Sequence, residues 1–170
     1  NQPDEGKNYN IFNICQVISK QKKTVIIIDA QGDLEFLKTT PNAHKPLLFN
    51  TTIEGACYLD LFSSEYLHYS SDKIQPLVNS LKDSADFIII NNEFLNEECR
   101  ALLMMKIADT NLFVVDARKT PLKLISRLEL LKEEFAIPNL SFLLNKAGHN
   151  PNVIKGVLDW MKKYIKKIKQ

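Results

Sequence analysis

The run VIIID at residues 25–29 decides the fold, together with a second run, FIIIN, at residues 87–91. Both runs are apolar without alternation, which is typical of a strand inside a parallel sheet that helices cover on both faces. Each run ends in a polar residue, Asp29 or Asn91. Because α/β folds bind ligands beyond the carboxyl ends of parallel strands, these two residues are candidates for a functional site.

Further runs of the same kind predict the rest of the sheet. The strands expected from apolar runs are 24–29, 86–91, 111–116 and 139–145, with 56–61 as a probable strand and 47–50 as a weaker one. Stretches of helical length and amphipathic pattern alternate with them, at 7–21, 71–83, 95–107, 121–135 and 151–168. This alternation predicts an α/β three-layer sandwich with a mainly parallel, doubly wound sheet. Segment 30–55, rich in turn-forming residues, is expected to be a long loop.

Composition places the chain among ordinary globular proteins. Its 170 residues fit a single domain spanning 1–170, and 22 basic residues nearly balance 20 acidic ones. This balance gives no reason to expect a nucleic-acid partner, and no apolar run approaches the ~20 residues of a membrane span. The cysteines are too far apart for a local metal motif and are expected to be free buried thiols, with no metal centre: Cys15, Cys57 and Cys99.

The segment NQPDEGKN at residues 1–8 has features of a phosphate-binding loop. Gly6 and Lys7 open a predicted helix, whose N-terminal N–H groups and lysine would attract an anion. Asn8, however, stands where a hydroxyl would bind Mg²⁺, and Asp4 stands where glycine is usual. A carboxylate ~4 Å from a phosphate charge costs about 4 kcal/mol at an effective dielectric near 20. By itself the Gly-Lys pair also fits an ordinary loop and helix cap.

Two strand ends carry amides where an ATP-dependent enzyme would use acids. Asp29 is followed by Gln31 two positions later, so only one acid of a catalytic pair is present. Asn91 ends the second strand, and an amide is a poorer Mg²⁺ ligand than a carboxylate. Asp29 could alternatively close its strand and cap a turn.

The order and spacing of these sites resemble the cytoplasmic kinase domain of bacterial tyrosine kinases (BY-kinases), which are relatives of the MinD/ParA ATPases in the P-loop superfamily. The family's Pro-Gly-Glu-Gly-Lys-Ser/Thr loop is matched by PDEGKN at 3–8, its Asp-x-Asp-x-Arg site by DAQGD at 29–33, and its Asp-x-Pro-Pro site by NNEF at 91–94. Segment 108–121 is also similar to the family, and Asn145 resembles the asparagine at the family's strand end that lies near the adenine.

The resemblance implies Gly6, Lys7, Asn8 and Asn145 as cofactor-binding residues and Asp29 as a catalytic residue. It implies ATP and Mg²⁺ as cofactors, with weak or absent binding because of the amide replacements. The expected function is that of a degenerate BY-kinase-like domain, a cytoplasmic regulatory or scaffolding module in capsular or exopolysaccharide biosynthesis and export. Its partners would be further copies of itself or other domains of the export complex, and any membrane association would use segments outside this chain.

Two alternatives remain open at the level of sequence. One is an active tyrosine autokinase that uses Glu93 or Asp33 as an unconventional acid, and the other is a MinD/ParA-like positioning ATPase. The family also has a strand feeding the phosphate loop, which is expected to be missing or to lie outside this chain. The C-terminal segment 151–168 is expected to be a packed helix with its lysines in solvent, or else a basic membrane-surface or partner helix.

Overall fold

The computed structural model describes residues 6–43, 48–61, 71–92 and 99–147. In chain order the elements are α1 (Lys7–Lys20), β1 (Val25–Asp29), the 3₁₀ turn η1 (Glu35–Leu37), β2 (Lys38–Pro41), β3 (Phe49–Thr51), β4 (Ala56–Asp60), α2 (Ser71–Leu81), the 3₁₀ turn η3 (Lys82–Ser84), β5 (Phe87–Asn91), α3 (Cys99–Ile107), β6 (Asn111–Asp116), α4 (Leu122–Glu134) and β7 (Leu140–Asn145). The predicted strands and four of the five predicted helices are present. The fifth, at 151–168, lies outside the described residues.

The first sheet has the order β2-β3-β4-β1-β5, with β1 parallel to both β4 and β5. All five residues of β1 are buried, as expected of an unbroken apolar run between two parallel neighbours. The register aligns the last residue of β1, Asp29, with Asp60 on one side and Asn91 on the other. The polar ends of three strands therefore form one row.

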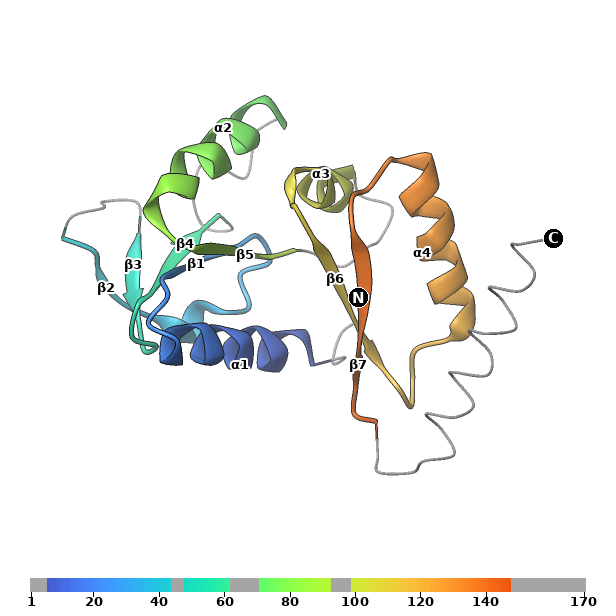
Figure 1. The fold of residues 1–170 in the computed structure, drawn as a ribbon, viewed down its shortest axis with the longest axis horizontal. Coiled ribbons are helices and arrows are strands. Elements are labelled where there is room, and N and C mark those ends of the chain that lie inside the picture. The colour runs from blue at the N-terminus through green and yellow to red at the C-terminus, as the bar shows by residue number, and fades with distance from the viewer. Residues whose placement is uncertain (1–5, 44–47, 62–70, 93–98, 148–170) are drawn as a thin grey trace.

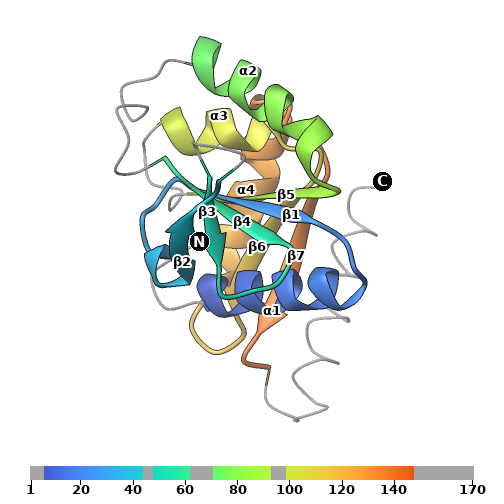
Figure 2. The ribbon, with the colours of Figure 1, turned by 90° about the vertical axis from the view of Figure 1, so that its left-hand side faces the viewer.

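Helices cover both faces of this sheet (Figures 1 and 2). On one face, Val25 and Ile27 of β1 pack with Ile11 and Cys15 of α1. On the other face, Ile26 and Ile28 belong to a cluster that also contains residues of α2 and α3: Ile74, Val78 and Met104. The alternating sides of one fully buried strand thus hold two helical layers, and the predicted three-layer α/β sandwich is confirmed.

Strands β6 and β7 form a second, parallel pair that no backbone ladder joins to the first sheet within the described residues. Figure 1 shows this pair next to β5, with β6 turned relative to β5. Its own cluster contains Met105 of α3, Phe113 of β6 and Leu128 of α4. The parallel strands are present as predicted, but they are divided between two sheets.

Segment 30–55 is not the continuous loop that was expected. It contains η1 and an antiparallel pair, β2 and β3, which extends the sheet beyond β4. Side chains as well as ladder bonds stabilise the pair, since the Thr39 hydroxyl donates to the Asn50 carbonyl at 2.9 Å and the Asn50 amide donates to the Thr40 hydroxyl at 3.1 Å. Threonine favours strands, and Pro41 is tolerated because β2 is an edge strand.

Two element boundaries need comment. Helix α3 is described from Cys99 onward, and its predicted start at residue 95 lies outside the described residues. Pro121 was expected in the first turn of α4, but it precedes the helix in an extended conformation with ψ of 138°. Proline has no N–H to donate, so it suits this cap position as well.

Ile27→Ala should destabilise the protein by about 2–5 kcal/mol, because Ile27 is completely buried in the central strand and truncation leaves a cavity. Urea denaturation followed by circular dichroism measures the loss. The control is Leu130→Ala on α4, whose side chain is 66% exposed and whose truncation should change stability by no more than about 0.5 kcal/mol. Equal effects of the two substitutions would contradict the assignment of β1 to the core.

Candidate functional site

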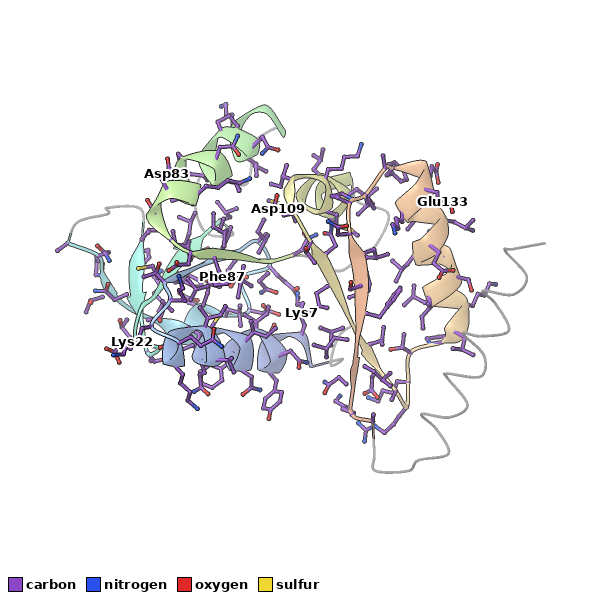
Figure 3. The ribbon with its side chains drawn as sticks, viewed as in Figure 1. Lys7, Lys22, Asp83, Phe87, Asp109 and Glu133 are labelled. Atoms are coloured by element: carbon purple, nitrogen blue, oxygen red, sulfur yellow. The ribbon has the colours of Figure 1, made fainter. Side chains whose placement is uncertain are left out.

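The candidate site lies where the carboxyl ends of β1 and β5 meet the N-terminus of α1. The parallel register brings Asp29 beside Asn91, and Lys7 at the start of α1 reaches the segments that follow both strands. Figure 3 shows Lys7 at the end of α1 that is nearest to β6 and β7. The structure therefore brings together the predicted site residues Gly6, Lys7 and Asp29.

Asp29 is completely buried and accepts five hydrogen bonds. Three donors are backbone N–H groups of the following loop, those of Gln31 at 3.1 Å, Gly32 at 3.0 Å and Leu34 at 2.9 Å. The other two are the Tyr58 hydroxyl at 2.9 Å and the Asn91 amide at 2.8 Å. A carboxylate offers about four lone-pair positions, so this one has no position left for a metal ion or a substrate proton.

Tyr58 is the partner that sequence reasoning missed. It lies in β4 and is completely buried. Burial raises the pKa of its hydroxyl well above the ordinary value, and the nearby charge of Asp29 adds to this effect. Tyr58 therefore stays protonated and keeps donating to Asp29 throughout the physiological pH range. The available signal was its position in a run that pairs with β1, but the pairing itself could not be read from sequence.

Asn91 holds two carboxylates together. Its side-chain nitrogen donates to Asp29 Oδ1 at 2.8 Å and to Asp33 Oδ1 at 2.5 Å, and the residue is completely buried. An amide NH₂ has two hydrogens, so one donor can serve each carboxylate. An aspartate at this position would instead add a third negative charge that needs a cation. The amide thus stands where an enzyme of this fold would be expected to need an acid and a metal ion.

Lys7 is directed to neutral oxygens of the site loops. It is only 9% exposed, and its ammonium donates to the side-chain oxygen of Gln31 and to the backbone carbonyl of Asn92 at 2.6 Å. To bind a phosphate, the ammonium of Lys7 would have to break both of these hydrogen bonds. Gln31 therefore supplies an acceptor for Lys7 in this structure, besides standing at the position where a second acid was expected.

Asn8 follows Lys7 in α1 and reaches the loop after β1. Its side-chain nitrogen donates to the Asp33 carbonyl at a long 3.5 Å, while its Oδ1 atom is buried and has no hydrogen-bond partner among the described residues. Asn91 Oδ1 is a second buried acceptor of this kind. Leaving a buried acceptor unpaired costs about 1–3 kcal/mol of folding free energy. A hydrogen bond from water or from a ligand N–H to either oxygen would therefore be favourable.

Gly6 and Asn145, two of the residues that the resemblance implies as cofactor-binding, lie in contact. Gly6 has a φ of +86°, and a Cβ atom on it would overlap the side-chain nitrogen of Asn145. Asn145 also accepts the N–H of Lys146 through its Oδ1 atom at 2.9 Å. Only glycine fits at position 6, because any side chain would be strained and would collide with the end of β7.

The described residues do not fit a magnesium site. No group of three or more histidine, cysteine, aspartate or glutamate residues in the described part of the chain could hold a metal ion. Two carboxylates of the site, those of Asp29 and Asp33, are already bridged by the Asn91 amide. Mg²⁺ prefers carboxylate and phosphate oxygens in octahedral geometry. Binding it here would require the present hydrogen bonds to be broken.

A second polar cluster, also missed by sequence reasoning, lies at the ends of β6 and β7. The Asp116 side chain is completely buried and accepts the Arg118 N–H at 2.9 Å, while Lys146 forms an ion pair with it at 3.0 Å. These contacts, the backbone N–H first, hold the pKa of Asp116 well below its usual range. The cluster fixes the loop after β6 next to Asn145, through a bond from the Ala117 N–H to the Asn145 carbonyl at 2.9 Å.

Comparison with known proteins identifies the fold. No protein-family model matches the chain, and no curated protein matches it in sequence. Among solved structures, the cell division ATPase MinD of Pyrococcus furiosus aligns with a TM-score of 0.71 and 17% identity, over 93% of this chain and 76% of that protein. The kinase domain of the Escherichia coli tyrosine kinase ETK aligns with a TM-score of 0.71 and 16% identity, over 85% of this chain and 64% of that domain.

A third similar structure contains a bound nucleotide. Cobyrinic acid a,c-diamide synthase from Mycobacterium smegmatis, with ADP and magnesium bound, aligns with a TM-score of 0.68 and 15% identity over 93% of this chain and 78% of that enzyme. Together these similarities show that the chain has the α/β fold that MinD, the ETK kinase domain and cobyrinic acid a,c-diamide synthase share. In the described residues no helix is both long enough and apolar enough to cross a membrane.

Acid should unfold the protein partly through two aspartates whose pKa values are depressed. Hydrogen bonds from Lys23 and Thr24 lower the pKa of Asp86 to about 2, and the contacts described above lower that of Asp116 further. A depressed carboxyl pKa contributes stability above the unfolded value, near ~3.9 for Asp, and loses it as the pH falls toward the folded value. We therefore expect the melting temperature to fall from about pH 4 downward.

The test is to measure the melting temperature of Asp116→Asn between pH 7 and pH 2. This variant should be less stable than the wild type at pH 7, and its melting temperature should fall less steeply in acid. Glu129→Gln is the control, since Glu129 is exposed on α4 and its replacement should leave the profile unchanged. Parallel acid profiles for the wild type and Asp116→Asn would show that Asp116 makes no such contribution.

Proposed function

We propose that this chain is a regulatory or scaffolding domain with the fold of a bacterial tyrosine kinase, in which the nucleotide site is remodelled into a metal-free polar network. The observation that supports this most strongly is the Asn91 amide, which bridges Asp29 and Asp33. The resemblance of the sequence motifs to BY-kinases and the structural similarity to the ETK kinase domain favour a role in capsular or exopolysaccharide export.

In this proposal Asp29 is a positioning residue. Its five hydrogen bonds tie together the loop after β1, Tyr58 of β4 and Asn91 of β5. Its earlier assignment as a catalytic residue stays a prediction, and the saturated carboxylate favours the structural role. The network would give a partner domain a rigid surface at the strand ends without needing a bound nucleotide.

Residual nucleotide binding is the main alternative, and one observation favours it. Among the described residues, the buried oxygens of Asn8 and Asn91 have no hydrogen-bond partner, and Gly6 and Lys7 stand at the start of α1, where a helix N-terminus attracts an anion. A nucleotide could bind weakly there if Lys7 left Gln31 and Asn92. The same fold in MinD supports a positioning ATPase only as a more distant alternative.

Calorimetric titration with Mg-ATP, together with a phosphotyrosine assay, tests the proposal. The wild type should bind Mg-ATP with a dissociation constant above the micromolar range and form no phosphotyrosine. Asp4 repels phosphate, and the amides Asn8, Gln31 and Asn91 offer no charged ligand to the metal ion. Asp4 lies outside the described residues, so its contribution rests on the sequence alone. Micromolar or tighter Mg-dependent binding, or phosphotyrosine formation, would overturn the proposal.

A set of reversions tests whether these residues cause the defect. The combination of Asp4→Gly, Asn8→Ser, Gln31→Asp and Asn91→Asp should restore measurable Mg-ATP binding and raise the melting temperature when Mg-ATP is added. Each single reversion should restore little Mg-ATP binding, even though Asn91→Asp alone should create a site for free Mg²⁺, since nucleotide binding needs the loop, the hydroxyl and the carboxylates together. If the combined variant folds but is not stabilised by Mg-ATP, the site has been remodelled in its backbone rather than only in its side chains.

A further inference from the structure

Helix α4 carries two exposed leucines on the side that faces away from its own core. Leu130 is 66% exposed and Leu122 is 51% exposed, whereas Leu128 is buried in the cluster that α4 forms with α3 and β6. In a helix of 3.6 residues per turn, Leu122, Ser126 and Leu130 lie along one side, opposite to Leu128. Figure 1 shows α4 on the outer side of β6 and β7. This outer stripe of α4, formed by Leu122, Ser126 and Leu130, therefore presents an apolar residue on either side of Ser126.

The charged residues of α4 are ordered against the preference of a helix. Those in the first half are basic and those in the second half, apart from Lys132, are acidic: Lys123 and Arg127, then Glu129, Glu133 and Glu134. The helix dipole favours the reverse order, with acids near the N-terminus and bases near the C-terminus. Like charges also stand four residues apart, as in Lys123 and Arg127, and such pairs destabilise an isolated helix. The arrangement therefore does not serve the stability of α4 by itself.

Within the described part of the chain, no charged partner compensates for this order. The five residues are exposed, and none of them forms an ion pair with another described residue. Electrostatic complementarity fixes which surfaces associate and in which register. Basic and acidic halves that stay unpaired on one exposed helix therefore favour a partner whose charges run in the opposite direction.

A second copy of α4 is complementary to this stripe. When two identical helices pack antiparallel about a two-fold axis at Ser126, each residue faces the partner residue that lies equally far from Ser126 in the opposite direction. Leu122 of one copy then meets Leu130 of the other, four residues from Ser126, and Lys123 meets Glu129, three residues from it. Symmetry makes both contacts occur twice. Ser126 itself is small, so the two helix axes can approach closely where they cross.

We propose that the outer stripe of α4 is a self-association surface, through which two copies of this chain pair with their α4 helices antiparallel about Ser126. The basic start of each helix lies beside the acidic end of the other, which also brings opposite ends of the two helix dipoles together. An unrelated partner would not require apolar and charged residues placed symmetrically about one residue. The inference concerns α4 and not the strand ends, so it goes beyond the proposed function and holds whether or not a nucleotide binds.

The size of the surface sets the strength of the dimer. Helix α4 has 13 residues and is therefore about 20 Å long. A single pair of such helices buries less than the ~1,200 Å² of a standard stable interface, so the dimer is weak. We expect a dissociation constant between about 10 µM and about 1 mM. Melting curves recorded at about 1 µM consequently report on the monomer.

Sedimentation equilibrium of charge-reversal variants tests the proposal. The wild type should form dimers as its concentration rises toward about 1 mM. Lys123→Glu and Glu129→Lys each place like charges across both symmetric contacts, so each should raise the dissociation constant at least about 10-fold. The matched controls are Lys20→Glu on α1 and Glu54→Lys before β4, which reverse exposed charges elsewhere and should leave the association unchanged.

Charge exchange tests the antiparallel register. The double variant Lys123→Glu/Glu129→Lys swaps the charges of each contact and should recover the wild-type dissociation constant. An equimolar mixture of the two single variants should also form dimers, because opposite charges then meet at both contacts of the mixed pair. Both positions are exposed, so the melting temperature of each variant at about 1 µM should stay within about 2 °C of the wild type.

Three results would overturn the proposal. A wild type that stays monomeric at about 1 mM would show that the stripe does not self-associate, whether residues 151–168 of the same chain cover it or solvent does. Dimers that Lys123→Glu and Glu129→Lys leave unchanged would assign the contact to another surface. Failure of the mixed single variants to associate would exclude the antiparallel register about Ser126.

Discussion

The buried carboxylate of Asp29 is the constraint on which the site depends. A charge in the interior is tolerated only when enough donors surround it, and this one collects donors from its own loop, from β4 and from β5. Asn91 can serve as one of them because the parallel register places it beside Asp29. The same amide donates a hydrogen bond to Asp33 as well, so no cation is required between the two carboxylates. The position at which the sequence motifs would place metal ligands is thus closed by hydrogen bonds.

The central fold was predictable from sequence because its signals are local. The unbroken runs at β1 and β5 mark strands that are buried on both faces, and the helices between them have a clear period. The start of α1 at Gly6 and Lys7 was also predictable, since a Gly-Lys pair opens the helix of a phosphate-binding loop. The antiparallel pair β2 and β3 was missed, because turn-forming residues such as Pro41 and Asn42 conceal strands that are stabilised by side-chain bonds within the pair.

The site was only half predictable. Sequence shows which residues end the strands, but not that the Tyr58 hydroxyl reaches Asp29 or that Lys146 pairs with Asp116. These contacts join residues far apart in the chain and depend on register. The division of the sheet was also invisible, because β6 has the same apolar pattern as a strand with two neighbours. An apolar strand pattern indicates that the side chains are buried. It does not indicate which strand pairs with each edge, because pairing depends on the neighbouring strands in the fold.

The most direct test is the melting temperature of Asn91→Asp with and without Mg²⁺. The variant replaces a donor with a third carboxylate, so it should melt at lower temperature than the wild type at pH 7 and regain stability when Mg²⁺ is added, while the wild type should not respond. Asn111→Asp is the matched control, because Asn111 is also a buried amide but donates to the carbonyls of Met105 and Pro138, so Mg²⁺ should not rescue it. If Asn91→Asp is as stable as the wild type without Mg²⁺, the amide is not what holds Asp29 and Asp33 together, and the account of a metal-free site is wrong.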